Sequence, residues 1–238
     1  METRMKGKLL IAVLVVLAVV IGVMVWCKLY RVVPQPAWIN ADQRDNFLYG
    51  SVGAQEVAGI PYWIWLSMPR MFPEYMPKPG GYAALGLSWE ESIEMPAGFA
   101  KQRIGYIRVT GNCALCHATS TLAPDEVPTV VPAVPGHTTD IQPLLTFFTR
   151  CARDPRFNAD EFLSQMDNWT NLSLVDRLLY RYVLIPRIRK ALLDPAPVIL
   201  APELLLHRRD PKSDAPFSTE RMKALRDWVK QHEVPANP

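Results

Sequence analysis

The sequence lacks the features of several common protein classes. Its net charge is only +3, and it has neither a basic run nor basic residues interleaved with aromatics, which argues against nucleic acid as a partner. It has no internal repeat, and no stretch alternates apolar and polar residues with the period of two that is typical of a half-buried strand. Apolar residues make up 49% of the 238 positions, enough for a packed core of one large or two small domains.

Cysteine and histidine are also scarce, with four of each. Three of these eight residues nevertheless form one cluster, CALCH at 113–117, which chance would produce in roughly one chain in a thousand of this composition. The chain has no second Cys/His pair at ligand spacing, as a zinc site would need, and no βαβ pattern around the cluster, as a thioredoxin-like redox pair would need. Both alternatives are therefore disfavoured.

The spacing of Cys113, Cys116 and His117 matches the signature of covalent haem attachment. Each thiol can form a thioether with one haem vinyl group, and the histidine that follows is delivered to one face of the iron as an axial ligand. We therefore expect one covalently bound haem c, with Cys113 and Cys116 as its anchors and His117 as an iron ligand.

The ligand on the other face of the iron decides between electron transfer and oxygen chemistry. His137, in a Pro-Gly-His-Thr sequence twenty residues downstream, is the nearest candidate for this sixth position; the alternative is a loop histidine that is hydrogen-bonded locally. The remaining candidates are more typical of surface histidines or of methionines that fill a core: His207, His232, Met68, Met71 and Met76.

Charged residues are absent from residues 9–27, which as a helix would span about 28 Å, close to the roughly 30 Å of a bilayer core. Basic residues precede this segment, which favours a cytoplasmic N-terminus, and no small-x-small cleavage site closes it, as a signal peptide would require. We therefore expect a single-pass protein of a bacterial inner membrane with its soluble part in the periplasm. The predicted divisions are an anchor at 1–27, a linker at 28–45 and a c-type haem domain at 46–238.

Helical periodicity dominates the second half of the chain. Apolar residues recur with that period from Ile141 to Ala152, Ser173 begins a capping-box pattern, Pro186 predicts a kink, and residues 219–232 form a last amphipathic pattern. The 22 prolines, several of them within 119–143, predict long irregular loops. The predicted fold is mainly α with extensive proline-rich loops, a cytochrome c-like haem domain after one transmembrane helix.

Longer strings of residues surround the haem motif. They are YGSVG at 49–53, GIPYWIWL at 59–66, FPEY at 72–75, PGGYA at 79–83, GF at 98–99, CARDPRFN at 151–158 and DRLLYR at 176–181. With CALCH they resemble, over residues 45–195, the N-terminal haem region of the rubber oxygenase-like di-haem cytochromes, relatives of the bacterial di-haem cytochrome c peroxidases. The resemblance implies that His117 is the proximal ligand of an iron with an open sixth position.

The chain departs from that family in one respect: family members are longer and carry a second Cys-x-x-Cys-His, and this chain has only one. The resemblance therefore does not by itself assign oxygenase or peroxidase activity to this chain. The first hypothesis is a membrane-anchored mono-haem c-type cytochrome that transfers electrons to a redox partner protein, which a second haem-bearing subunit could supply. The alternative is an oxygen- or peroxide-reactive haem enzyme, as half of a split di-haem protein; a non-functional remnant is a third reading.

Overall fold

The computed structural model describes residues 2–56, 58–90, 93–121, 129–134 and 137–195, together with residue 199. The helix predicted at 219–232 and the histidines at 207 and 232 lie outside the described residues. The described part is mainly helical, as the sequence predicts. Its α-helices are α1 (Glu2–Leu29), α2 (Ala37–Ala41), α3 (Gln43–Tyr49), α4 (Tyr62–Met71), α5 (Ala114–His117), α6 (Ile141–Arg153), α7 (Ala159–Met166), α8 (Leu174–Leu179) and α9 (Ile185–Ala191). Shorter turns of 3-10 helix are η1 (Ala54–Glu56), η2 (Pro73–Tyr75) and η3 (Gly81–Leu85), and η4 (Tyr180–Leu184) is a π-helix.

Two antiparallel sheets are present that the sequence did not predict. The larger has the order β1-β3-β4-β2, and the smaller pairs β5 with β6. The strands are β1 (Val32–Val33), β2 (Ile60–Pro61), β3 (Phe99–Ile104), β4 (Tyr106–Gly111), β5 (Ala118–Thr121) and β6 (Thr129–Pro132). The prediction of an irregular loop over 119–143 is therefore wrong in part. The sequence of β3 explains the missing signal, because two adjacent buried residues, Phe99 and Ala100, are followed by three polar residues that are not buried, so that apolar and polar positions do not alternate.

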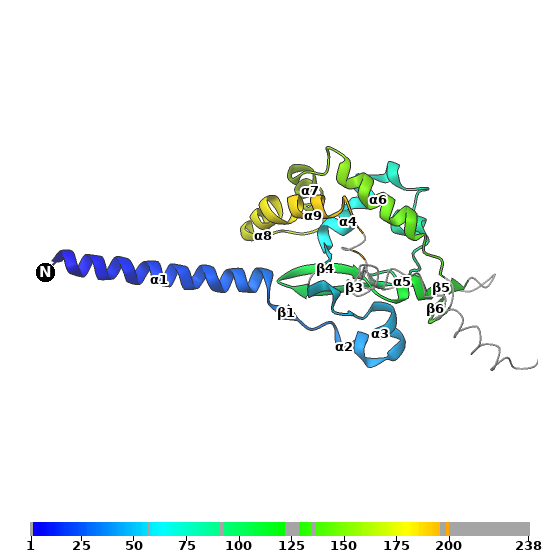
Figure 1. Cartoon of the computed structure of the whole chain (residues 1–238), viewed down its shortest axis with the longest axis horizontal. Coiled ribbons are helices and arrows are strands. Elements are labelled where there is room, and N and C mark those ends of the chain that lie inside the picture. The colour runs from blue at the N-terminus through cyan, green and yellow to red at the C-terminus, as the bar shows by residue number, and fades with distance from the viewer. Residues whose placement is uncertain are drawn as a thin grey trace, which may run out of the picture. The chain divides into compact units, whose positions relative to one another are not determined.

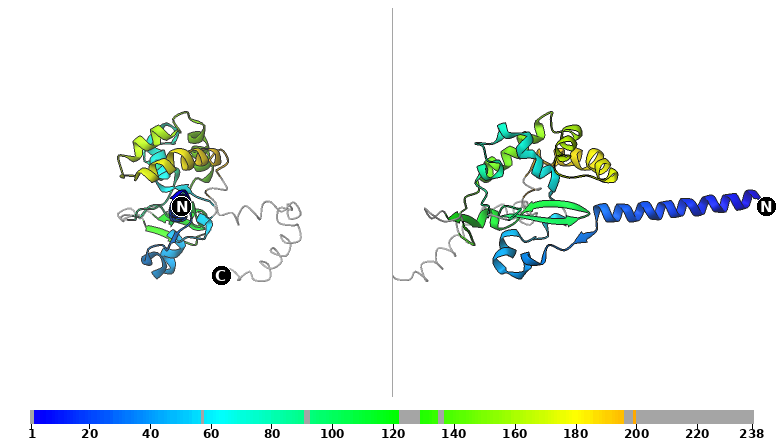
Figure 2. Two further views of the ribbon diagram at one scale, coloured as in Figure 1. Left: turned by 90° about the vertical axis from the view of Figure 1, so that its left-hand side faces the viewer. Right: turned by 180° about the vertical axis from the view of Figure 1, so that it is seen from behind.

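The larger sheet lies between two groups of helices (Figures 1 and 2), with α4, α6, α7 and α9 on one side and α2 and α3 on the other. The main core forms beneath the larger group, where the ring of Trp65 stacks on that of Tyr82 with 4.2 Å between ring centroids. The Tyr82 hydroxyl also donates to the Trp65 carbonyl at 2.7 Å. A smaller core lies on the other side and contains Ile39, Leu48, Tyr49, Ala97, Ala114, Ala118 and Val130.

The predicted helices of the second half are confirmed within the described residues. Helix α6 buries Leu144, Phe148 and Ala152. Ser173 is the N-cap of α8, and its side chain accepts a hydrogen bond from the backbone N–H of Asp176. The π-helix η4 occurs directly before Pro186, where the missing proline N–H leaves an upstream carbonyl without its usual helical donor.

Helix α1 contains one segment, Ile11–Leu29, that is long and apolar enough to cross a membrane, and none of it is buried in the protein. The chain after this helix has secondary structure of its own: the predicted linker at 28–45 contains β1, α2 and the start of α3. Strand β1 pairs with β3, with Val32 opposite Ile104, so that the end of α1 is tied to the larger sheet. The backbone N–H of Gly105, in the turn between β3 and β4, also donates to the carbonyl of Arg31 at 2.8 Å.

Candidate haem-attachment site

The CALCH cluster forms a single helical turn, α5, immediately after strand β4. Cys113 is the N-cap residue, and its side chain and that of His117 are exposed, whereas Cys116 is half-buried. The two intervening residues are buried, with Ala114 at 2% and Leu115 at 1% exposure. The turn therefore presents its two thiols and its imidazole on one side and its apolar residues on the other.

The two buried residues of α5 pack into different cores. Leu115 belongs to the main core, whereas Ala114 belongs to the smaller core on the other side of the sheet. A four-residue helix has too few hydrogen bonds to be stable alone, so these two contacts hold the turn in place. They also fix its rotation, because turning α5 to bury Cys113 or His117 would expose Leu115.

Asn112 connects the turn to the chain that precedes it. Its buried side chain donates hydrogen bonds to the carbonyls of Leu48 (3.2 Å) and Gly50 (3.0 Å) and accepts one from the backbone N–H of Ala114 (3.0 Å). The side chain thus caps α5 and binds it to the end of α3. The sequence reasoning missed this residue; the only signal was its position directly before the motif.

Gly98 allows the motif turn to approach strand β3. It has a φ of +88°, which favours glycine, and a β-carbon there would lie 2.5 Å from Cα and 2.6 Å from N of Leu115. The backbone carbonyl of Gly98 also accepts a hydrogen bond from the N–H of Asn112 at 2.9 Å. Gly98 belongs to the strings that carry the family resemblance, but the sequence alone gives it no role.

Contacts from α3 hold the chain both before and after the motif. Arg44 on α3 pairs with the carboxylate of Glu90 and donates to the carbonyl of Val130 on β6 at 3.1 Å. The hydroxyl of Tyr49 also donates to Glu90 at 2.6 Å. Partial burial alone would raise the pKa of Glu90, but the hydrogen bonds from Arg44 and Tyr49 outweigh it and lower this pKa. Since β6 pairs with β5, this network supports the strand that leaves His117.

All four cysteines are free thiols within the described structure. Burial, with a smaller contribution from Cys113, raises the pKa of the Cys116 thiol, so that Cys116 stays protonated near neutral pH. Cys151 is fully buried in the main core, where burial raises its pKa strongly, so this thiol packs as a small apolar side chain.

His137 lies in the loop before α6, and its Nδ1 is 2.7 Å from the carbonyl oxygen of Thr139. With the proton on Nδ1, this contact leaves Nε2 as the free lone pair, the arrangement found in many metal-binding histidines. Two short hydrogen bonds link this loop to the strand after the motif: Ser120 Oγ donates to Ser88 Oγ (2.7 Å), which lies 2.9 Å from Thr138 Oγ1. The loop that carries His137 is thus tied to the strand that follows His117.

Of the upstream methionines, Met68 is fully buried in the main core. Met71 and Met76 are partly buried and pack against the same core. The aromatic segment at 62–76 therefore supplies core through Trp65 and Met68, as the more common interpretation of such residues expects.

The donor set fits a covalently attached haem. Two free thiols and an imidazole share the outer side of one rigid turn, and no disulfide or ion pair engages them within the described residues. A zinc centre fits less well, because the three motif side chains do not gather around one point as a metal-binding group, and no other His, Cys, Asp or Glu side chains form one in the described part of the chain.

Comparison of the chain with protein-family models, with curated proteins and with solved structures gives no match. The resemblance to the rubber oxygenase-like cytochromes thus stays a prediction that rests on the quoted residues.

Proposed function

We propose that this protein is a membrane-anchored mono-haem c-type cytochrome. Cys113 and Cys116 would carry the haem as thioethers, and His117 would be the axial ligand on one side of the iron. The bound haem would supply a one-electron redox centre. In this proposal residues 46–238 form a cytochrome c-like haem domain on the periplasmic side of a bacterial inner membrane, and its partner is another redox protein, such as a second haem-bearing subunit.

The observation that carries the proposal is the orientation of the motif turn. Ala114 and Leu115 are buried in two separate cores. Cys113, Cys116 and His117 therefore share the side of the helical turn that faces away from these two buried residues. Attachment of a flat macrocycle needs this division, because both thiols and the imidazole must reach one group while the backbone between them stays fixed.

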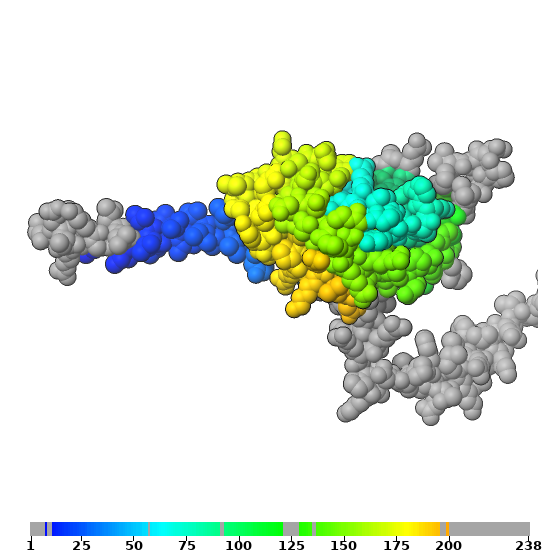
Figure 3. Space-filling model, turned by 90° about the horizontal axis from the view of Figure 1, so that it is seen from above, coloured from blue at the N-terminus to red at the C-terminus, as the bar shows by residue number. Residues whose placement is uncertain are grey.

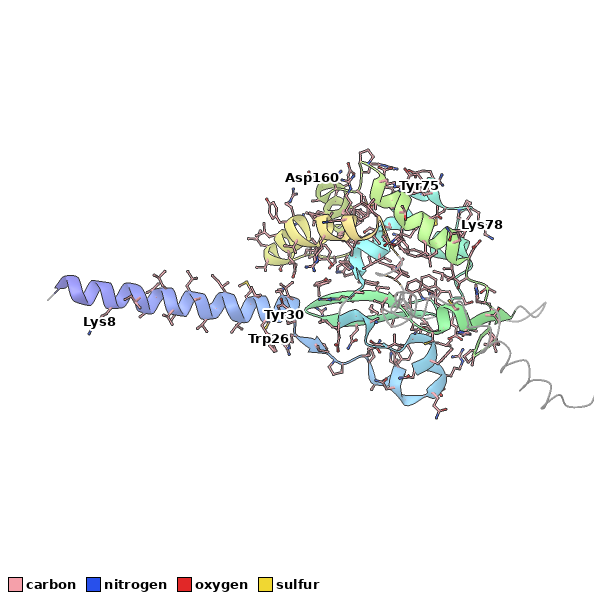
Figure 4. The ribbon with its side chains drawn as sticks, viewed as in Figure 1. Lys8, Trp26, Tyr30, Tyr75, Lys78 and Asp160 are labelled. Atoms are coloured by element: carbon pink, nitrogen blue, oxygen red, sulfur yellow. The ribbon has the colours of Figure 1, made fainter. Side chains whose placement is uncertain are left out.

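The membrane part of the proposal rests on α1. Its segment Ile11–Leu29 has a mean hydropathy of 2.7 and no burial within the protein, as expected for a helix whose surroundings are lipid. Figure 4 shows Lys8 in the first part of this helix and Trp26 and Tyr30 near its other end, where basic and aromatic side chains are typical of the two membrane surfaces. Export of the following domain would bring the motif to the compartment where c-type haem is attached.

Covalent attachment tests the proposal directly. The full chain is expressed in a bacterial host that matures c-type cytochromes, denatured and extracted with acidified acetone. We expect one haem per chain to stay with the polypeptide. Loss of the haem to the solvent would contradict the proposal.

Substitution of the cysteines gives the matched comparison. Replacing both Cys113 and Cys116 by alanine should abolish haem retention. The Cys151→Ala variant should retain it, because that thiol is fully buried in the core. Retention by the double variant would mean that other residues hold the haem.

A further inference from the structure

A cavity of about 430 Å³ lies at the junction of α1 with the domain, a volume within the range of small-molecule sites. The end of α1 forms one wall, β4 forms the second, and α9 with the preceding π-helix forms the third. The lining residues used below are Leu29, Tyr30, Arg108, Leu184, Arg187 and Ile188. None of the three motif residues contributes to its lining.

The cavity lies at the level where α1 leaves a bilayer. Leu29 ends the segment that can cross a membrane, and Tyr30, which is 64% exposed, follows it. Helix α8 reaches the same level, because Nζ of Lys28 lies 2.6 Å from the carboxylate of Asp176. Figure 3 shows α8 and η4 (yellow) at the edge of the domain from which α1 (blue) extends. On this edge Leu174 is 72% exposed, which suits contact with lipid.

The lining also contains one acidic residue, Glu56, but the structure gives its carboxylate no ion pair with Arg108 or Arg187, so two cations of the lining face a single anion. The guanidinium of Arg108 donates to the carbonyls of Gln55 (3.0 Å) and Leu29 (3.3 Å), which position it and leave its charge uncancelled. Arg187 is exposed and forms no ion pair with any residue that the structure describes. Arg181, on the preceding turn and outside the lining, is paired with Asp160 at 2.7 Å.

We propose that this cavity binds the phosphate headgroup of an anionic phospholipid from the membrane that α1 crosses. Two guanidinium groups match the geometry and charge of a phosphate, and they lie beside apolar walls from Leu184 and Ile188 that can contact the first carbons of the acyl chains. The inference rests on the membrane-anchoring part of the proposed function and is independent of the haem.

The test uses the full chain in detergent micelles and native mass spectrometry. The probes are dihexanoyl phosphatidylglycerol, dihexanoyl phosphatidylcholine and inorganic phosphate. We expect saturable binding of one phosphatidylglycerol, weaker binding of the zwitterionic lipid, and weaker binding of phosphate, which lacks the acyl chains. Absence of saturable binding overturns the proposal, and phosphate bound as tightly as the lipid overturns the lipid as the ligand.

Two arginine variants locate the site. Arg187→Gln removes a cation from the lining and should weaken binding of phosphatidylglycerol roughly tenfold, the effect of losing one charge-assisted hydrogen bond. Arg181→Gln, outside the lining, should bind as the wild type does, and an equal effect of both variants would place the lipid elsewhere and overturn the assignment. Extraction of membranes with alkaline carbonate tests the anchor separately: release of the protein refutes both inferences, whereas retention without lipid binding refutes this one alone.

Discussion

Gly98 lies directly against Leu115, where a β-carbon at position 98 would be 2.5 Å from the Leu115 Cα. This contact joins strand β3 to the motif turn through backbone atoms, which cannot move aside as a flexible side chain can. A Gly98→Ala substitution should therefore displace α5 and destabilise the protein by about 3 kcal/mol, combining strain at positive φ with the steric clash. Thermal unfolding of the full chain in detergent would measure the loss, together with a lower yield of haem-loaded protein.

Gly53 offers a matched control. It has a φ of +83°, close to the +88° of Gly98, but a β-carbon there would meet nothing within 4 Å. Gly53→Ala should therefore cost only about 1 kcal/mol, the contribution of the backbone conformation. Equal costs for the two variants would show that the contact with Leu115 does not position the motif.

Removal of the Asn112 side chain should leave the Gly50 carbonyl and the Ala114 N–H without a partner, whereas the Leu48 carbonyl keeps the hydrogen bond from the Gly98 N–H. We expect Asn112→Ala to lower the free energy of unfolding by about 3 kcal/mol and to reduce haem attachment. Denaturant unfolding would measure the change. Asn46→Ala is the comparison, since this asparagine makes one exposed hydrogen bond to Asn40 and should change the stability by less than about 0.5 kcal/mol.

Acidification should remove the contribution of Asp154. Hydrogen bonds from Arg156 and, to a lesser degree, from Tyr75 lower the pKa of this nearly buried carboxyl against the opposing effect of burial. A depressed pKa means that the stabilisation is complete above the unfolded-state value of about 3.9 and is lost as the pH falls through the folded-state value. The difference in Tm between the wild type and Asp154→Asn should therefore shrink as the pH falls below about 4.

Asp160 provides the control for that pH series. Its side chain is 80% exposed, although it pairs with Arg181, so Asp160→Asn should leave Tm within error of the wild type across the series. A Tm difference for Asp154→Asn that stayed constant with pH would mean that ionisation of this carboxyl does not contribute to stability.

Carbon monoxide should bind the reduced protein and shift its Soret band, because the family resemblance implies an open or weakly held sixth position. Visible spectra with and without the gas would show this. Binding would make oxygen or peroxide chemistry worth assaying. An unmoved band from low-spin iron would instead mean that a strong ligand fills the sixth position. His137→Ala should then make the iron reactive to the gas, since the Thr139 contact leaves His137 Nε2 free.

The N-terminus of the mature protein should precede the apolar segment. No cleavage site closes residues 9–27, and α1 continues without interruption to Leu29. Edman sequencing of protein purified from membranes would show the first residue. A start beyond residue 28 would identify the segment as a removed signal peptide.

Helical periodicity and helix capping were readable from the sequence, and the sheets were not. The pattern from Ile141 to Ala152 and the cap at Ser173 depend on neighbours within about four residues, so they correspond to real helices. Strand β3 depends on pairing with β4, and its sequence of two buried apolar residues followed by three polar ones lacks the alternation by which a strand is recognised.

The chemistry-bearing residues of the site were predictable because their spacing is local. The orientation of Cys113 and His117 was not, since it depends on Leu115 and Ala114 entering two different cores. The residues that position the motif were not predictable for the same reason, because Gly98 and Asn112 act through contacts with chain segments far away in sequence. The local spacing of Cys113, Cys116 and His117 thus identifies the reacting groups, whereas tertiary contacts determine their orientation.

Strand β4 also limits how far the motif can stand from the membrane. It begins beside Gly105, which is bonded to the chain just after α1, and it ends just before Asn112. At about 3.3 Å per residue, the start of the motif lies no more than roughly 30 Å from the end of the membrane helix. A haem held there would stay in a thin layer above the lipid. A membrane-bound partner would then meet it by lateral diffusion in two dimensions, and the rate of encounter between the two proteins would depend on their densities in the membrane.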